Sequence, residues 1–543
     1  MTPNPSANDQ ESKTNIPPWE IQSAVESPGW LALVARPRNC FAIALLILLP
    51  WHLAWISSSS NFAGLPKPVG DGPDYENIAF HLSGTGEYRF NNSNQGWRSA
   101  YENANHLGLP QTEEKGSEDE ATLQTEVPYQ AQLNASRRDF LSTSRPPALP
   151  WAISLIYQLV GRNAMGFRTV RLVLAASLAV AGALSVWLAS TVLPYLLPAS
   201  QVGETVDRRS DLPISEASVN WPVVFGAFIA LALNLLNATL RSYATDFLTE
   251  PFALLFLQLF ITALVIAWSA QVRLKRGVEV LAGISLALMI LSRSIFVVWL
   301  PFLMVLLILA APNFRVSRTR FPALRSSVIV VGTALLLCCP WWVRNCIVLE
   351  RFSPLGTQGT ITLIGGYCDA AVSANGEWQA APEQRLRERI RLRPGIQNAK
   401  NDTQRELLVA KEASQQLRGW IREHWSELPR LAVSRVITHW NPYSGKSLFW
   451  KTLIAVGALA FLWPRKQPKH HSSDSSGLSR RHFALLLIGP PAISTVTTAM
   501  LYAAGGRFLV PCYGVLFSLS GVGAGWLLYQ SMQLFKLRLN NAL

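Results

Sequence analysis

Charged residues are scarce in this sequence. Asp, Glu, Lys and Arg make up 15% of its 543 residues, whereas hydrophobic residues make up 49%. A soluble chain of this length would form several domains with charged surfaces, but here the apolar runs reach membrane-spanning length. The composition therefore predicts an all-α polytopic membrane protein whose spans share one bundle, interrupted by two long polar insertions.

Three further absences narrow the class. The six cysteines lack metal-ligand spacing, so we expect free buried thiols, with a Cys346–Cys368 disulfide as the alternative. No small-residue cleavage site follows the first apolar segment, which we interpret as a retained anchor. No repeat relates two halves of the chain, although such repeats are typical of secondary transporters.

Acidic residues are fewer than basic ones, 34 against 48, which gives a net charge of +14. Much of the basic charge lies in short clusters beside apolar segments. There it orients the protein and meets anionic lipid head groups. We therefore expect the lipid bilayer, and no nucleic acid, as a partner.

The apolar stretches predict about ten transmembrane helices, with both chain ends in the cytoplasm. The segment Pro146 to Gly161 covers only about 24 Å, short of the roughly 30 Å hydrocarbon core, so we place it along the interface. The basic stretches 271–276, 313–325 and 464–481 and the C-terminal tail then all lie inside, as the positive-inside rule requires. The predicted spans are 40–57, 170–197, 219–240, 251–270, 278–292, 295–311, 326–343, 448–463, 482–503 and 508–530.

Four regions follow from this topology. We expect a disordered cytoplasmic tail at 1–39, a transmembrane module at 40–343 with an extracytoplasmic loop at 58–169, an extracytoplasmic helical insertion at 344–447, and C-terminal transmembrane helices at 448–543. Within the insertion, the amphipathic stretch 403–437 predicts two helices broken near Pro429. The basic run 385–395 lies outside in this topology, and the Glu-rich patch 113–120 is interpreted as a solvated loop.

The stretch Gly70 to Phe90 is the strongest candidate for a functional site. Asp71 and Asp74 precede an amphipathic run at helical spacing, in which Tyr75 and Ile78 share one face. The alternative is a solvated loop whose helix only rests on the bilayer.

The same topology places an unusual set of charges on the outer face beside these aspartates: Arg145, Arg168, Arg171, Glu250, Arg293, Arg344 and Arg507. Each arginine alone could be a snorkelling residue at the interface. Together they favour phosphate binding, because a guanidinium binds phosphate oxygens bidentately. A carboxylate facing them predicts chemistry at a phosphate-linked carbon, in which phosphate departs and the carboxylate takes a proton from the incoming group.

Seven segments, in the same order, resemble motifs of the lipid-linked-sugar glycosyltransferases of the GT-C fold, and most closely the protein O-mannosyltransferase and lipid A aminoarabinose transferase family. They extend from Asp71 to about Val515 and read DGPDYENIAFHLSGTGEY, SRPPALPWAISLIYQLVG, GFRTVRLV, NATLRSYATDFLTEPFALLF, LAGISLALMILSRS, PWWVRNCIVLERFSPLGTQG and GGRFLVPCYGVL. The resemblance implies a GT-C-like bundle with extracytoplasmic juxtamembrane helices. It also implies a polyprenyl-phosphate sugar as donor.

The resemblance assigns roles by position. Asp71, four residues before Tyr75, matches the catalytic aspartate, and Arg145 matches the basic residue that contacts the lipid phosphate. The chain departs from the pattern at Gly72, where many relatives have an acidic residue that Asp74 could replace, and at Arg145, where Lys or His is commoner. The other charged family positions are matched by Arg171, Glu250, Arg293, Arg344 and Arg507.

We therefore predict an inverting glycosyltransferase in the plasma (inner) membrane, acting outside the cytoplasm on an acceptor that the sequence does not define. Asp71 would be the base, supported by Asp74, Tyr75 and Glu250, and the matched arginines would hold the phosphate. No cofactor or metal is expected, because the arginines supply positive charge; the alternative is a metal held by Asp71, Asp74 and Glu250. Two other classes stay open, a transporter or lipid-linked-sugar flippase and a non-catalytic membrane scaffold.

Overall fold

The computed structural model describes residues 36–67, 70–106, 138–197, 220–269, 275–310, 320–353, 356–391, 402–441, 448–463 and 479–542. These residues form helices, apart from turns and one two-stranded antiparallel sheet of β1 (Arg89–Asn91) and β2 (Asp139–Leu141). The all-α prediction is therefore confirmed. The predicted disordered tail at 1–39 is wrong at its end, because the first helix begins at Pro37. Residues 1–35 of that tail, the patch at 113–120 and most of the basic loops at 271–276, 313–325 and 464–481 lie outside the described residues.

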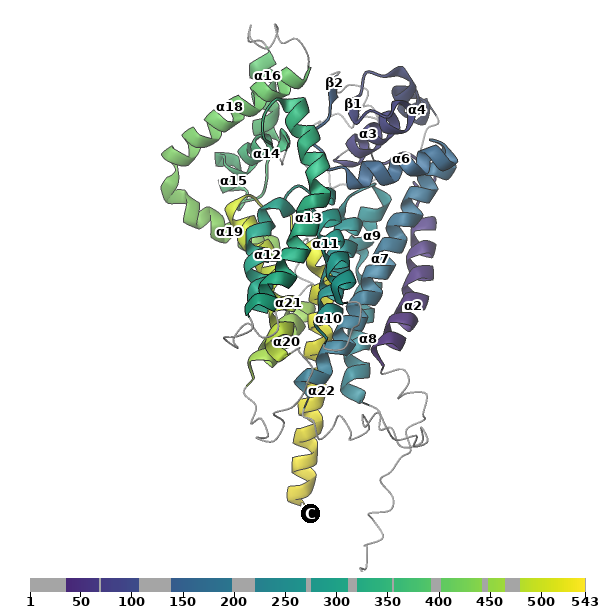
Figure 1. Ribbon diagram of the computed structural model, residues 1–543, viewed down its shortest axis with the longest axis vertical. Coiled ribbons are helices and arrows are strands. Elements are labelled where there is room, and N and C mark those ends of the chain that lie inside the picture. The colour runs from purple at the N-terminus through teal and green to yellow at the C-terminus, as the bar shows by residue number, and fades with distance from the viewer. Residues whose placement is uncertain are drawn as a thin grey trace, which may run out of the picture.

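A bundle of long helices forms the body of the molecule (Figure 1). A helix is present over each of the ten predicted spans: α2 (Pro37–Ser57), α7 (Ala164–Val192), the bent pair α8 (Trp221–Leu236) and α9 (Ala238–Thr245), α10 (Glu250–Trp268), α11 (Lys275–Ser292), α12 (Phe296–Ala310), α13 (Arg320–Leu349), α20 (Leu448–Leu462), α21 (Arg480–Met500) and α22 (Tyr513–Ala542). Short 3-10 turns at η1 (Leu193–Leu196) and η6 (Val510–Cys512) extend α7 and precede α22.

Six helices in the described part of the chain are long and apolar enough to cross a membrane, or seven if the α8/α9 pair is one span. The other three are less apolar or shorter: α11 begins with charged residues, and α12 and α20 have 15 residues each. Large apolar side chains such as Leu46 and Leu336 are about three-quarters exposed on the outside of the bundle, at 75% and 73%. Such a surface requires lipid around it. The chain is therefore a multi-pass membrane protein, and ten crossings stays a prediction.

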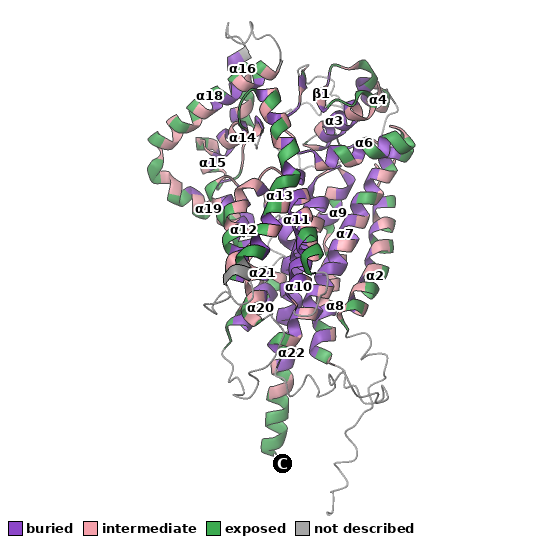
Figure 2. Cartoon of the chain, in the orientation of Figure 1, coloured by how far each residue is buried: buried purple, intermediate pink, exposed green. Residues whose placement is uncertain are grey.

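The middle of the bundle is well packed. Figure 2 shows buried residues concentrated on α10 and the first part of α22, whereas α2 and α13 carry exposed residues on their outer sides. Close contact between helices depends on glycine, because a Cβ at Gly521 of α22 would lie 2.5 Å from the carbonyl oxygen of Gly226 on α8. Small residues that let backbones approach are typical of membrane helix pairs.

Helix α6 (Ala148–Val160) lies across one end of the bundle and not along it (Figure 1). One face buries Leu149 and Ile153, while Leu155 and Leu159 on the other face are exposed. This two-sided pattern suits a helix at the surface of a bilayer. The predicted interfacial segment therefore forms a short amphipathic helix.

The predicted site stretch forms α3 (Gly72–Thr85), which precedes β1 and α4 (Gln95–His106) at the same end of the bundle (Figure 1). Tyr75 and Ile78 are buried, as their helical spacing predicts. Pro73 sits in the first turn, where its missing N–H costs no hydrogen bond. A Cβ at Gly72 would lie 2.3 Å from the carbonyl oxygen of Asp246, so a side chain at this position would require the start of α3 to shift.

The insertion folds beside this end of the bundle. It contains α14 (Gln358–Gly366), α15 (Asp369–Ser373), α16 (Ala381–Arg391), α18 (Asp402–Glu423), η4 (Trp425–Glu427) and α19 (Leu428–Trp440). A small apolar core joins α14, α16 and α18 through residues such as Ile364, Leu386 and Ala413. The two predicted helices are α18 and α19. Pro429 lies in the first turn of α19, so the break between the helices falls just before it.

All six cysteines lie in described residues and are free, so Cys346 and Cys368 form no disulfide. Cys40, Cys338 and Cys512 are buried, as expected for structural thiols, whereas Cys339 is exposed. The two ends of the bundle differ in the elements that lie there. Helices α3, α6, α14 and α16 occupy the end opposite the C-terminal end of α22 (Figure 1).

Candidate active site

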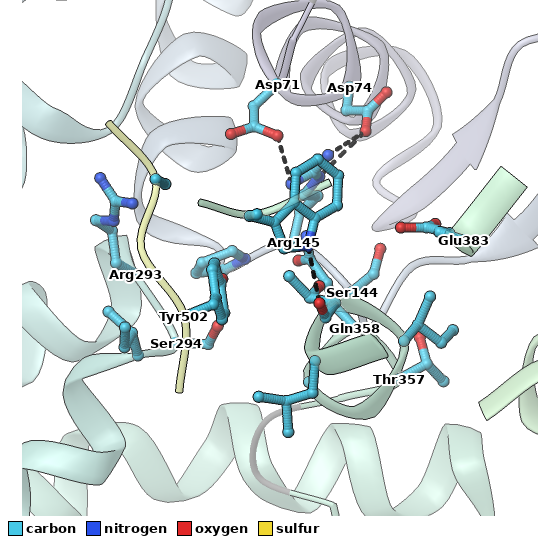
Figure 3. A pocket seen from close by; sticks show the side chains of 18 of the residues that line it. Asp71, Asp74, Ser144, Arg145, Arg293, Ser294, Thr357, Gln358, Glu383 and Tyr502 are labelled. Atoms are coloured by element: carbon cyan, nitrogen blue, oxygen red, sulfur yellow. Dashed lines mark hydrogen bonds and ion pairs between the residues drawn. The ribbon is translucent and has the colours of Figure 1, made fainter. Parts of the chain in front are cut away.

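A cavity of about 380 Å³ opens among α3, the segment before α6, the α11–α12 junction, the insertion and the segment before α22 (Figure 3). Six predicted site residues line it: Asp71, Asp74, Tyr75, Arg145, Arg293 and Arg507. They come from positions more than 400 residues apart in the chain. The fold thus brings the acidic stretch and three of the predicted arginines to one place.

Asp71 lies at the N-cap of α3, and both of its carboxylate oxygens bind guanidinium groups. Arg145 Nη1 lies 2.8 Å from Oδ1, and Arg507 Nη1 lies 2.9 Å from Oδ2. Burial disfavours the charged form, but the charges of Arg145 and Arg507 outweigh it and hold the pKa of the Asp71 carboxyl well below its usual range. Asp71 is therefore ionised in the ligand-free site.

Arg145 links the two aspartates. Its Nη2 and Nε donate to Asp74 Oδ2 at 2.6 and 3.1 Å, and its guanidinium lies over the Tyr75 ring, 5.6 Å from the centroid. The side-chain amide of Gln358 is oriented so that both its nitrogen and its oxygen form hydrogen bonds. In this orientation its oxygen accepts a further bond from Arg145 Nη1 at 2.9 Å. Pro146 and Pro147 follow directly, so the arginine stands on a stiff turn at the start of α6.

Glu250 forms the other end of the network. It lies at the start of α10, almost fully buried, and its Oε1 accepts from Arg293 Nη1 at 2.6 Å and from Arg507 Nε. It does not line the cavity itself; it holds two arginines that do. A carboxylate at a helix N-terminus is also stabilised by the helix dipole.

These six groups form a continuous chain of alternating charge in the order Asp74, Arg145, Asp71, Arg507, Glu250, Arg293. Three carboxylates face three guanidiniums, so the chain is neutral as a whole. Buried charges are tolerated when each is paired in this way. Burial raises the pKa of Tyr75 to about 12, and that of Tyr502 across the cavity to about 12, so both phenols stay protonated and can donate hydrogen bonds.

Two predicted phosphate ligands lie elsewhere. Arg171 is fully buried in α7, and its donors bind backbone carbonyls, including those of Thr245 and Gly64. Arg344 in α13 donates to the carbonyls of Ser142 and Tyr88. Neither lines the cavity, and Arg168 lies over the Phe62 ring. The structure therefore does not bring Arg171, Arg344 or Arg168 together with Asp71. Arg171 and Arg344 instead connect loops to helices through hydrogen bonds to backbone carbonyls.

Sequence reasoning missed several residues that line the cavity. Arg138, just before β2, lies over the Phe90 ring and has no carboxylate partner among the described residues. Its signal in the sequence was the basic pair at 137–138, seven residues before Arg145. Tyr502 and the insertion residues Trp378, Glu383, Arg387 and Glu406 also line the cavity, and no pattern in the sequence distinguished them.

The three carboxylates considered as metal ligands all accept from arginine: Asp71, Asp74 and Glu250. Within the described ranges, no group of three or more His, Cys, Asp or Glu side chains has an arrangement that could hold a metal ion. The guanidinium groups around Asp71 are hydrogen-bond donors, so the site is suited to binding an anion.

Comparison with known proteins finds no matching family model and no matching curated sequence. Among solved structures, the chain is similar to the archaeal oligosaccharyltransferase AglB from Archaeoglobus fulgidus in complex with an inhibitory peptide and a dolichol-phosphate, with 16% identity and a TM-score of 0.37. It is also similar to the apo form of the Archaeoglobus fulgidus oligosaccharyltransferase, with 13% identity and a TM-score of 0.33. Each match covers 74% of this chain, which spans less than half, 44%, of the length of those proteins.

Proposed function

We propose that the protein is an inverting glycosyltransferase that moves a sugar from a polyprenyl-phosphate donor to an acceptor on the extracytoplasmic face. One observation carries the proposal: the carboxyl group of Asp71 lies between Arg145 and Arg507 in a cavity at the end of an apolar helix bundle. A base and phosphate-binding groups at a membrane surface are what transfer of a sugar from a lipid phosphate requires.

The donor phosphate would bind the guanidiniums that face the cavity. Arg145, Arg293 and Arg507 line it from three different elements, and Arg138 adds a charge that no described carboxylate neutralises. Planar guanidiniums can bind phosphate oxygens bidentately. The lipid tail would lie along the apolar outside of the bundle, where side chains such as Leu46 and Leu336 are exposed.

Sugar transfer would then be a single displacement. The acceptor hydroxyl oxygen bonds to the anomeric carbon, the bond from that carbon to the phosphate oxygen breaks, and the electron pair leaves with the phosphate. Asp71 takes the hydroxyl proton, and the arginines stabilise the departing anion. Attack opposite the leaving group inverts the anomeric configuration.

The ion pairs of Asp71 also limit its strength as a base. A carboxylate bound by two guanidiniums is a poor proton acceptor. A phosphate that draws Arg145 and Arg507 toward itself weakens both pairs, so Asp71 becomes more basic only when donor is present. Asp74 and Glu250, the second partners of these arginines, keep them in place during the exchange.

No metal enters this proposal, because the arginines supply the positive charge that a divalent ion would otherwise provide. Activity should therefore survive treatment of the purified protein with EDTA. Loss of activity in EDTA that is restored by added Mg²⁺ or Mn²⁺ would instead support a metal-assisted reaction.

The test compares Asp71→Asn with Asp139→Asn, which removes an ion-paired aspartate outside the cavity wall. Purified protein in nanodiscs is given a set of undecaprenyl- and dolichyl-phosphate hexoses and pentoses, and release of the polyprenyl phosphate is measured. We expect Asp71→Asn to lower the rate by about 10²- to 10⁴-fold, the usual range for loss of a general base, and Asp139→Asn to leave it unchanged. Equal rates for wild type and Asp71→Asn, or lipid flux across vesicles without sugar transfer, would overturn the proposal.

A further inference from the structure

The cavity has a second wall, built by the insertion. Gln358 and Thr362 of α14, Glu383 of α16 and Glu406 of α18 line it, together with Trp378 from the loop between α15 and α16. Figure 3 shows Glu383 and Arg293 on opposite sides of the cavity, with Asp71 and Asp74 above it. Apart from the bond between Gln358 and Arg145, the proposed phosphate chemistry does not use this insertion wall.

Trp378 is fixed in place on the insertion wall. Its indole Nε1 donates to the carbonyl of Thr362 at 2.8 Å, and its backbone N–H donates to the carbonyl of Ala503 at 2.8 Å. A Cβ on Gly365 would lie 2.3 Å from the indole nitrogen, so the ring packs against bare backbone. The Glu377–Ala503 bridge joins this loop to the segment that carries Arg507, and the ring is thus held at a set position relative to the arginines.

The same wall carries a charged triad. Arg387 Nε donates to Glu383 at 3.0 Å, and its two terminal nitrogens bind both oxygens of Glu406 at 2.8 and 3.3 Å. Two carboxylates share one guanidinium, so the triad carries one excess negative charge. Glu383 is more exposed than Glu406, with 27% of its side chain accessible against 10%, and its carboxylate lies at the cavity.

We infer that the insertion wall binds a neutral carbohydrate. A fixed indole offers an apolar face for the C–H face of a pyranose ring, and the Glu383 carboxylate accepts charge-assisted hydrogen bonds from hydroxyls. The excess negative charge of the triad repels phosphate, which is held instead by the arginines. The arginines therefore favour a ligand that carries phosphate, and the insertion wall favours a neutral one.

Identification of this carbohydrate as the sugar acceptor rests on the proposed function. Its hydroxyl would then enter the cavity from the insertion side, opposite the arginine-bound phosphate. That arrangement is what displacement with inversion needs, since nucleophile and leaving group approach the anomeric carbon from opposite faces.

Binding is tested on the full chain in nanodiscs, because maltoside detergents carry sugar head groups of their own. Saturation-transfer NMR is recorded with methyl α-D-mannopyranoside, methyl β-D-glucopyranoside and methyl β-D-galactopyranoside. At least one should bind the wild type, and Glu383→Gln should raise its dissociation constant about tenfold, the effect of losing a hydrogen bond to a charged group. The matched control is Glu388→Gln on the exposed side of the same helix, which should bind like wild type.

A second variant, Trp378→Leu, removes the ring face and should abolish the saturation-transfer signal; its melting temperature checks that it is folded. Absence of binding by all three glycosides, or binding that neither Glu383→Gln nor Trp378→Leu changes, overturns the inference. The readout does not depend on catalysis, so Asp71→Asn should still bind the glycoside. If the wild type releases no polyprenyl phosphate but binds glycosides through Trp378, the proposed function fails and the carbohydrate site stands.

Discussion

At the scale of single residues, the site depends on which partner each charge has. Asp71 and Asp74 look alike in sequence, but Asp71 binds two arginines and Asp74 one. Arg145 and Arg344 also look alike, yet one binds carboxylates in the cavity and the other binds backbone carbonyls. Sequence supplied the candidates through spacing and resemblance. Partners could not be read from it, because they lie up to hundreds of residues away.

Arg145→Lys tests the bridging role of the guanidinium. Arg145 reaches Asp71 and Asp74 with separate nitrogens, whereas a lysine ammonium is a compact point charge that cannot reproduce this fork. We expect release of polyprenyl phosphate to fall about 10- to 100-fold, a loss of roughly 1.4 to 2.8 kcal/mol of transition-state stabilisation. Arg89→Lys, outside the cavity wall, serves as the control. Full activity of Arg145→Lys would show that charge alone is sufficient.

The lowered pKa of Asp71 predicts a pH effect on stability. A carboxyl whose pKa is lower in the folded state stabilises the fold above its unfolded pKa of about 3.9, and this contribution is lost as pH falls through the folded pKa. The difference in melting temperature between wild type and Asp71→Asn should therefore be constant from pH 8 to 5 and shrink only below about pH 4. A change centred between pH 5 and 7 would mean that Asp71 is not held ionised by its arginines.

At the scale of elements, the spacing of apolar residues predicted those helices whose position depends on the local sequence. Helix α3, the short amphipathic α6 and the α18–α19 pair form where the apolar spacing and Pro429 place them. The insertion wall was not predictable, because Glu383 and Glu406 sit on helices with many other charged residues. Only the packing of α14, α16 and α18 against one another selects which of those charges face the cavity.

Gly72→Ala tests how α3 positions Asp71. The added Cβ would lie 2.3 Å from the carbonyl oxygen of Asp246, so the start of α3 must shift. Overpacking of this kind costs about 1 to 3 kcal/mol, and we expect both a lower melting temperature and slower donor turnover. Gly84→Ala on the same helix meets nothing within 4 Å and should be neutral or stabilising. Equal behaviour of the two variants would show that the close approach at Gly72 does not position the site.

At the scale of the whole molecule, the bundle separates two ends. The cavity lies at the end with α3, α6 and the insertion, and α22 carries the C-terminus to the opposite end (Figure 1). The start of α2 lies at that opposite end as well. The chain from α2 to α22 therefore crosses the bundle an even number of times. This agrees with ten spans, although hydropathy alone could not decide whether α11, α12 and α20 cross.

The side of the membrane that the cavity faces is the last prediction. In a chain whose six native cysteines are replaced, Ser93→Cys places a thiol on the exposed loop before α4, and Asn541→Cys places one at the end of α22. A membrane-impermeant maleimide should label Ser93→Cys in intact cells and Asn541→Cys only after permeabilisation, because the positive-inside rule predicts that the α22 end is cytoplasmic. The reverse pattern would put the cavity inside, where a donor would have to be bound from the cytoplasmic leaflet. Labelling of both thiols in intact cells would require an odd total number of crossings. The structure does not allow that number, because the start of α2 and the end of α22 lie at the same end of the bundle.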